Sequence, residues 1–70
     1  MYRNIIKKSL AAINRTDIDP RHAEAYIRLE HSTLDGLSAE KFRQECEIAA
    51  ACVDEGGISA AEFLAESFGL

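Results

Sequence analysis

The chain has no tryptophan, one proline and only two cysteines. No apolar run approaches the roughly 20 residues needed to cross a bilayer. The start of the chain also lacks a secretory pattern, because two lysines directly follow Ile5 and Ile6. These absences predict a cytoplasmic protein with no membrane segment.

Bulky apolar side chains are scarce as well. Apolar residues make up 47% of the 70 residues, but eleven of them are alanine. A chain of this length buries only about 60% of the surface that it exposes when unfolded. Residues 1–70 therefore form one small domain of marginal stability, and self-association is a natural way to enlarge its core. We expect a homodimer.

The helical signal is strongest in residues 38–55. Ser38 is suited to cap a helix, and glycines at 56 and 57 are suited to end it. The residues between them place one apolar face at the three- and four-residue steps of a helix. That face consists of Phe42, Cys46, Ala49, Ala50 and Val53.

Other segments carry the same signal. Residues 2–15 form an amphipathic helix, and Asp19 with Pro20 begins a second that runs to about His31. A short fourth helix begins at Ser59. The bulky residues of this helix, Phe63, Leu64 and Phe68, should strengthen the core. No stretch alternates as a strand does. The expected fold is an all-α bundle of three to four helices.

The cysteines and histidines do not form a recognisable site. Cys46 and Cys52 lie six residues apart on one helix, so their side chains diverge by roughly 120° and cannot form a disulfide with each other. Their spacing does not fit a zinc motif. We expect Cys46 to be buried and Cys52 to be exposed or at an interface, and we expect His22 and His31 at the surface, one near each end of the second helix. No metal, cofactor or catalytic residue is predicted.

Charge is distributed unevenly along the chain. Residues 1–34 carry six bases and four acids, whereas residues 35–70 carry two bases and eight acids. Helix faces of opposite sign would help the two halves to pack together. An acidic face would alternatively dock on a basic protein partner, with charge steering the encounter. The partner-binding residues predicted on this basis are Asp35, Arg43, Glu47 and Glu55.

Ile48 and Cys52 lie off the main apolar stripe of the central helix and are the predicted dimer contacts. The leading interpretation is a non-enzymatic interaction protein that covers the working surface of a partner. An alternative is a nucleic-acid-binding regulator that uses Arg3, Lys7 and Lys8, although a net charge of −4 makes nucleic acid an unlikely ligand. A structural subunit of a larger assembly is a third interpretation, and an enzyme is the least supported.

Part of the chain resembles a known group of proteins. The residues that carry the resemblance lie between Glu24 and the end of the chain: Arg28, Glu30, Thr33, Leu34, Asp35, Leu37, Phe42, Glu45, Ile48, Ala49, Cys52 and the closing Ser67-Phe68-Gly69-Leu70. They are similar to short uncharacterised bacterial proteins carried by plasmids, phages and integrated elements. The resemblance implies an accessory protein that binds a host or element-encoded partner, and it implies no activity and no site.

Overall fold

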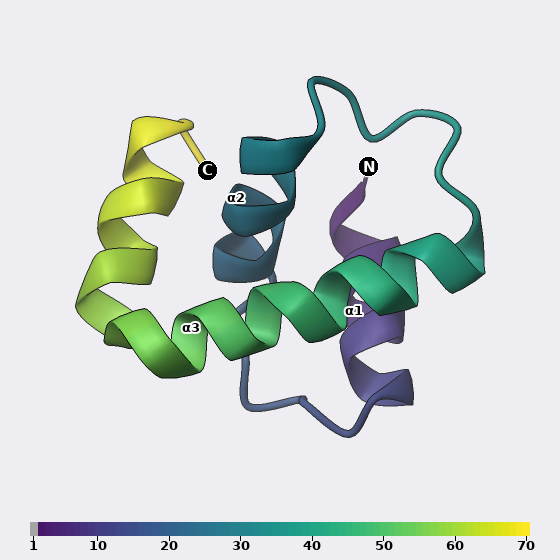
Figure 1. Cartoon of the computed structure of the whole chain (residues 1–70), viewed down its shortest axis with the longest axis horizontal. Coiled ribbons are helices and arrows are strands. Elements are labelled where there is room, and N and C mark those ends of the chain that lie inside the picture. The colour runs from purple at the N-terminus through teal and green to yellow at the C-terminus, as the bar shows by residue number, and fades with distance from the viewer. Residues whose placement is uncertain (1) are drawn as a thin grey trace.

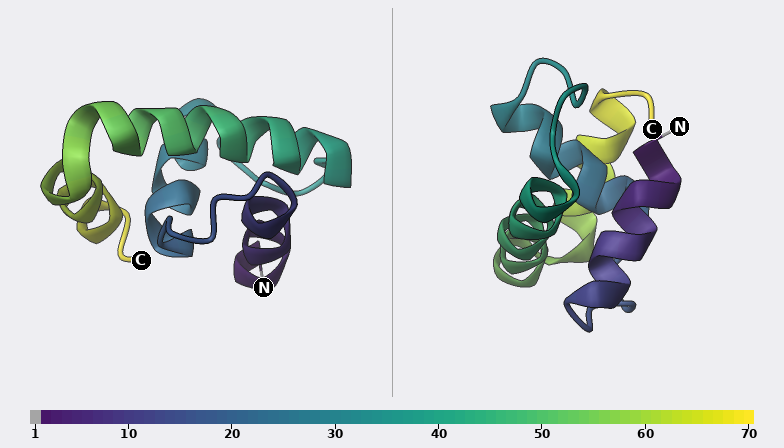
Figure 2. Two further views of the ribbon diagram at one scale, coloured as in Figure 1. Left: turned by 90° about the horizontal axis from the view of Figure 1, so that it is seen from below. Right: turned by 90° about the vertical axis from the view of Figure 1, so that its right-hand side faces the viewer.

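The computed structural model describes residues 2–70, which form three helices. These are α1 (Tyr2–Ala12), α2 (Pro20–Glu30) and α3 (Ala39–Ser67), with no strand in the described chain. The long α3 runs across both α1 and α2, which lie on the same side of it (Figure 1; Figure 2, left). Its last part turns and lies alongside α2, on the side away from α1 (Figure 1). The prediction of an all-α bundle is confirmed.

The helices begin where capping side chains meet their free amides. Asp19 accepts a hydrogen bond from the Arg21 amide at 2.9 Å, and Pro20 occupies the first turn of α2, where its missing N–H costs nothing. Ser38 accepts from the Lys41 amide at 3.1 Å at the start of α3. Both predicted starts are confirmed. The first helix ends three residues earlier than expected, at Ala12, and Asn14 adopts a left-handed φ of 60° just after it.

A kink at Gly57 divides α3. Gly57 has φ 82° and ψ 170°, a backbone conformation that residues with a Cβ rarely adopt. Helical geometry resumes directly after it rather than at Ser59, where a separate helix was predicted. The chain turns sharply at the kink, so that one long helix covers two sides of α2 (Figure 1).

The core lies where α3 crosses the other two helices. Its members come from every helix and both connections: Ile6, Leu10, Ile18, Ala23, Ile27, Leu34, Phe42, Cys46, Ala49, Ala50, Val53 and Ala61. The ring of Tyr2 stacks on that of Phe42, with centroids 6.4 Å apart. All five residues of the predicted central stripe are buried, so that prediction is confirmed.

The segment after the kink packs differently from the prediction. Ala61 and Ala65 are its buried residues, whereas Phe63 is 74% exposed and Phe68 is 40% exposed. Small side chains face inward because this segment lies close beside α2, and the aromatic rings are left on the outer side. The expectation that these rings would strengthen the core is therefore wrong, and their exposure leaves apolar surface facing solvent.

Arg15 joins the connection between α1 and α2 to the middle of α3. Its guanidinium donates to Asp54 at 2.7 and 2.9 Å and to Asp17 at 3.1 and 3.2 Å. These bonds hold the pKa of both carboxyls below the usual range. The cluster is exposed to solvent, so it contributes modestly to stability but fixes the direction of the loop.

Candidate functional site

One exposed apolar surface lies between α2 and α3. Leu29 on α2 is 58% exposed and Ile48 on α3 is 50% exposed. Together with Tyr26 and the half-buried Cys52, they line a hollow of about 60 Å³. We call these four residues the α2–α3 face. A cluster of exposed apolar side chains on two neighbouring helices is typical of a contact surface.

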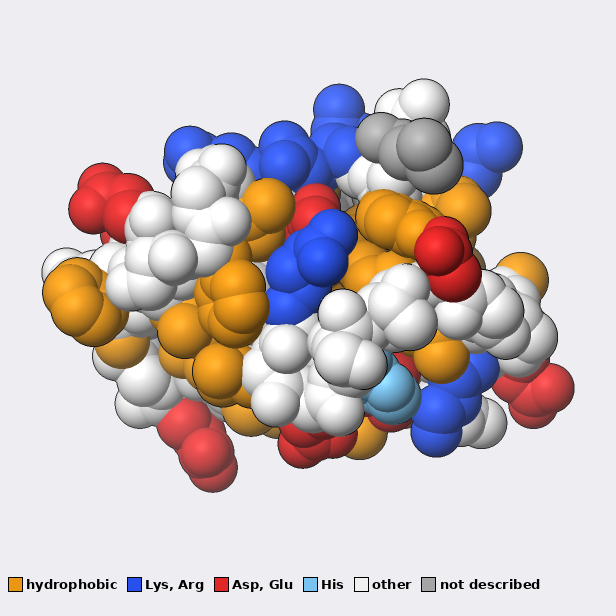
Figure 3. All heavy atoms as spheres, turned by 90° about the horizontal axis from the view of Figure 1, so that it is seen from above, with side chains coloured by type: hydrophobic (Ala, Val, Ile, Leu, Met, Phe, Trp, Pro, Cys, Tyr) orange, Lys and Arg blue, Asp and Glu red, His pale blue; other side chains and the backbone are white. Residues whose placement is uncertain are grey.

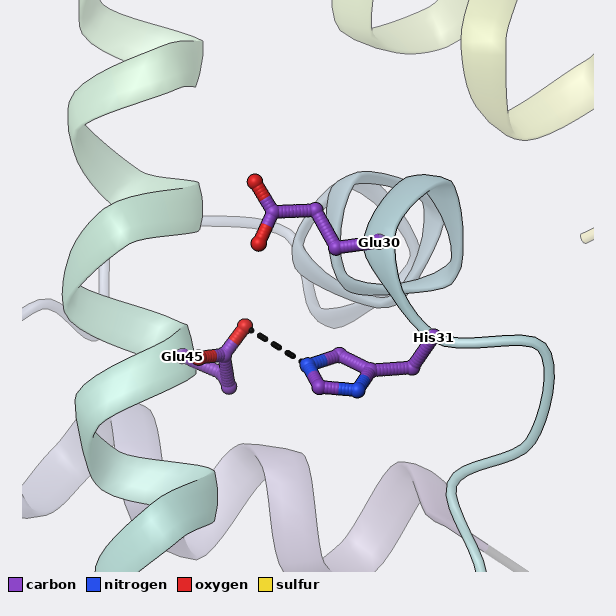
Figure 4. Close-up of side chains that lie close together, drawn as sticks. All are labelled: Glu30, His31 and Glu45. Carbon is purple, nitrogen blue, oxygen red and sulfur yellow. Dashed lines mark hydrogen bonds and ion pairs between the residues drawn. The ribbon is translucent and has the colours of Figure 1, made fainter.

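A polar cluster borders this face. Glu30 and Glu45 line the same hollow, and His31 lies just beyond the end of α2. The side chains of all three residues reach into the space between the helices (Figure 4). His31 Nε2 lies 3.1 Å from Glu45 Oε1, and one ligand atom from each of the three residues lies within 4.8 Å of the others.

Glu45 is the buried member of the cluster, at 6% exposed, while His31 is half-buried and Glu30 is exposed. A buried carboxylate needs partners to offset the loss of water. Its other oxygen, Oε2, lies 3.6 Å from Lys41 Nζ, one turn earlier on α3. The cluster therefore combines an enclosed anion with two neighbours that remain open to solvent.

A second apolar hollow lies between α1 and the start of α3. It has a volume of about 350 Å³ and is lined mainly by apolar groups, among them Ile5, Leu37 and Phe42. Lys8 and Arg43 stand at its walls, and neither forms an ion pair with another residue in the described chain. On the face shown in Figure 3, many Lys and Arg side chains follow one edge, and exposed hydrophobic side chains are interspersed with charged ones over the rest of the face.

The predicted partner-binding residues do not form one site. The Tyr2 hydroxyl donates a hydrogen bond to Asp35, which places Asp35 against α1. Arg43 lines the α1–α3 hollow. Glu47 and Glu55 are exposed on α3, but eight residues at roughly 100° each separate them by about 80° around the helix. Each is accessible, and their joint role in binding stays a prediction.

The predicted dimer contacts do lie together. Ile48 and Cys52 are one turn apart and line the same hollow. The sequence analysis did not single out Leu29, which is exposed and lines the same hollow as Ile48. Its exposure could not be read from the helical period alone, because it depends on which side of α2 the helix α3 covers.

His22 was expected at the surface and is 4% exposed. Its Nε2 has no hydrogen-bond partner in the described chain and lies 4.0 Å from Asp19 Oδ2, too far for a direct bond. The correction has a structural cause. The kink in α3 brings Glu62 and Gly57 over the first turn of α2, where they enclose the imidazole in a hollow of about 460 Å³.

The two cysteines differ in environment. Cys46 is fully buried, as predicted, and Cys52 is half-buried. Burial raises the pKa of the Cys46 thiol to about 11, so almost none of it is thiolate at pH 8.

We expect iodoacetamide to modify Cys52 much faster than Cys46 in the folded protein, as measured by mass spectrometry of peptides. Equal rates for the two residues would contradict the buried position of Cys46, and denaturant should make both react.

No protein-family model, curated protein or solved structure matches the chain at a significant level. None of the helices among residues 2–70 is both long enough and apolar enough to span a membrane. Any functional conclusion therefore depends on the surfaces described above.

Proposed function

We propose that the protein is a small, non-enzymatic interaction protein that works in the cytoplasm as a homodimer and occludes a surface of a protein partner. The observation that carries the proposal is the α2–α3 face. The chain exposes 4279 Å² in total, which is close to the roughly 4,300 Å² expected of a compact monomer of this mass. The exposure of Leu29 and Ile48 is thus a local feature and does not result from loose packing.

A second copy of the chain is the occupant that this face fits best. Lys41 and Glu55 each lie seven residues from Ile48, in opposite directions along α3. Seven residues are close to two helical turns, so all three residues follow one stripe. If two copies of α3 pack antiparallel about a two-fold axis at Ile48, Lys41 of each copy meets Glu55 of the other. Such self-complementarity is what a two-fold interface requires.

The remaining positions of the stripe are compatible with this pairing. Gln44 and Cys52 each lie four residues from Ile48, so they would face each other across the same axis. Leu29 would extend the contact from α2. Lys41 lies 3.6 Å from Glu45 Oε2 in its own chain, but its side chain is 46% exposed and can also approach a carboxylate of a second copy. Glu55 forms no ion pair within residues 2–70.

In this proposal, the surface of the chain that binds the protein partner lies outside the dimer interface. The exposed acids of α3, among them Glu47, which lies about 100° around the helix from Ile48, favour a basic protein surface. The resemblance to accessory proteins of mobile elements is in keeping with such a role.

Charge reversal tests the proposed register. We expect Lys41→Glu and Glu55→Lys each to weaken the dimer by roughly tenfold, because each places two like-charged pairs at the interface and an exposed pair contributes about 0.2–1 kcal/mol. The double variant should recover most of the loss. The measurement is sedimentation equilibrium, with thermal unfolding as a check that each variant folds. A double variant as weak as the sum of the two single variants would contradict this register.

A further inference from the structure

The polar cluster beside the α2–α3 face has a geometry that a hydrogen-bonded pair alone does not require. A pair needs only His31 and Glu45, yet Glu30 also turns its carboxylate toward them (Figure 4). We propose that Glu30, His31 and Glu45 form a binding site for one divalent transition-metal ion, such as Zn²⁺. The site lies within one chain and does not depend on self-association.

The distances suit a shared ion. Zn²⁺ binds imidazole nitrogen and carboxylate oxygen at about 2.0–2.2 Å, so two ligands on one tetrahedral ion lie about 3.3 Å apart. His31 Nε2 and Glu45 Oε1 are 3.1 Å apart. The Glu30 carboxylate lies within 4.8 Å of both and is exposed, so a small rotation of its side chain completes the approach.

The donor atoms select the kind of metal. One imidazole with two carboxylates favours Zn²⁺, Ni²⁺ or Co²⁺ over Mg²⁺ and Ca²⁺, which take oxygen ligands almost exclusively. Three protein ligands leave at least one position for water on the side that faces solvent. Two carboxylates also offset the charge of the ion.

The surroundings support Glu45 as the central ligand. Lys41 Nζ lies 3.6 Å from Glu45 Oε2, whereas His31 faces Oε1. The lysine therefore holds one oxygen of the carboxylate and leaves the other directed toward His31 and Glu30. The Lys41 side chain is 46% exposed, so it has room to withdraw from the ion.

Binding would strengthen a junction that already holds side-chain packing and the contact between His31 and Glu45. Glu30 and His31 mark the end of α2, and Glu45 lies in the second turn of α3. An ion between them fixes the end of α2 against α3 at the edge of the α2–α3 face. The α2–α3 face would thus be more rigid when the metal ion is bound than when it is absent.

The test is calorimetric titration of the untagged protein with ZnCl₂, followed by Co²⁺ absorption as a report of the ligands. We expect one Zn²⁺ per chain, a raised melting temperature, and no competition from Mg²⁺. His31→Gln and Glu30→Gln should each weaken binding by roughly tenfold or more, since loss of even an outer-shell partner costs 10–100-fold. These two variants change groups that are not fully buried, so their folds should persist.

Two matched controls separate this site from other ligands. Glu40→Gln removes an exposed carboxylate from the same helix, and Cys52→Ser removes the nearest accessible thiol; both should bind Zn²⁺ as the parent does. The absence of Zn²⁺ binding by the parent at millimolar concentration would overturn the proposal. Equal affinity of the parent and His31→Gln would overturn it as well. Light scattering of the same samples reports self-association independently.

Discussion

Replacing Phe42 with alanine is expected to remove most of the stability of the fold. Phe42 is 2% exposed, lies where α3 crosses α1, and stacks against Tyr2. Truncation of a buried phenylalanine typically costs about 3–5 kcal/mol. A 70-residue domain has only about 3.5–10 kcal/mol of unfolding free energy at 0.05–0.15 kcal/mol per residue. Urea denaturation followed by circular dichroism measures the loss.

Phe63→Ala is the matched control, because it makes the same chemical change at a ring that is 74% exposed. We expect this variant to stay within about 0.5 kcal/mol of the parent, as surface substitutions usually do. If the two variants lost similar stability, the assignment of Phe42 to the core and Phe63 to the surface would be wrong. Phe63 would then be buried in the native protein, and the segment after the kink would pack differently.

Replacing Ile48 with aspartate is expected to convert the proposed dimer to a monomer. The substitution places two unpaired charges next to each other at the proposed two-fold axis, where they lose water on association. In the isolated chain Ile48 is 50% exposed, so the monomer should remain folded. We expect dissociation constants to rise by at least a hundredfold, as measured by sedimentation equilibrium.

Ile58→Asp provides the control for this variant. Ile58 is even more exposed than Ile48 but lies beside the kink, away from the α2–α3 face. It should dimerise as the parent does. Loss of the dimer in Ile58→Asp but not in Ile48→Asp would move the interface to the segment after the kink.

Most of the fold could be predicted from the sequence, because its signals are local. Asp19 with Pro20 and Ser38 mark helix starts through bonds to amides two or three residues away. The buried stripe of α3 follows directly from the helical period. The position of the last segment is a different matter, since it depends on how α3 continues after Gly57. Two consecutive glycines indicate that the helix breaks there, but they do not determine the angle between the two parts of the helix.

The candidate site could be predicted only in part. Ile48 and Cys52 were found because residues outside a buried stripe on the same helix are readily identified. His31 and Glu45 lie fourteen residues apart, on either side of an irregular connection. Their contact depends on how α2 and α3 cross, which no local spacing encodes. His22 was assigned to the surface for the same reason, since Gly57 and Glu62, which line the hollow beside it, lie at and beyond the kink.

The central claim is that the α2–α3 face is covered by a second copy of the chain. The most direct test is the solution mass of the purified parent protein, by light scattering over a tenfold concentration range. The proposal predicts a mass of twice the 7.7 kDa of one chain, falling toward the single-chain value only on dilution. A mass of 7.7 kDa at every concentration would contradict it, and Leu29 and Ile48 would then be exposed apolar residues without a second copy to cover them.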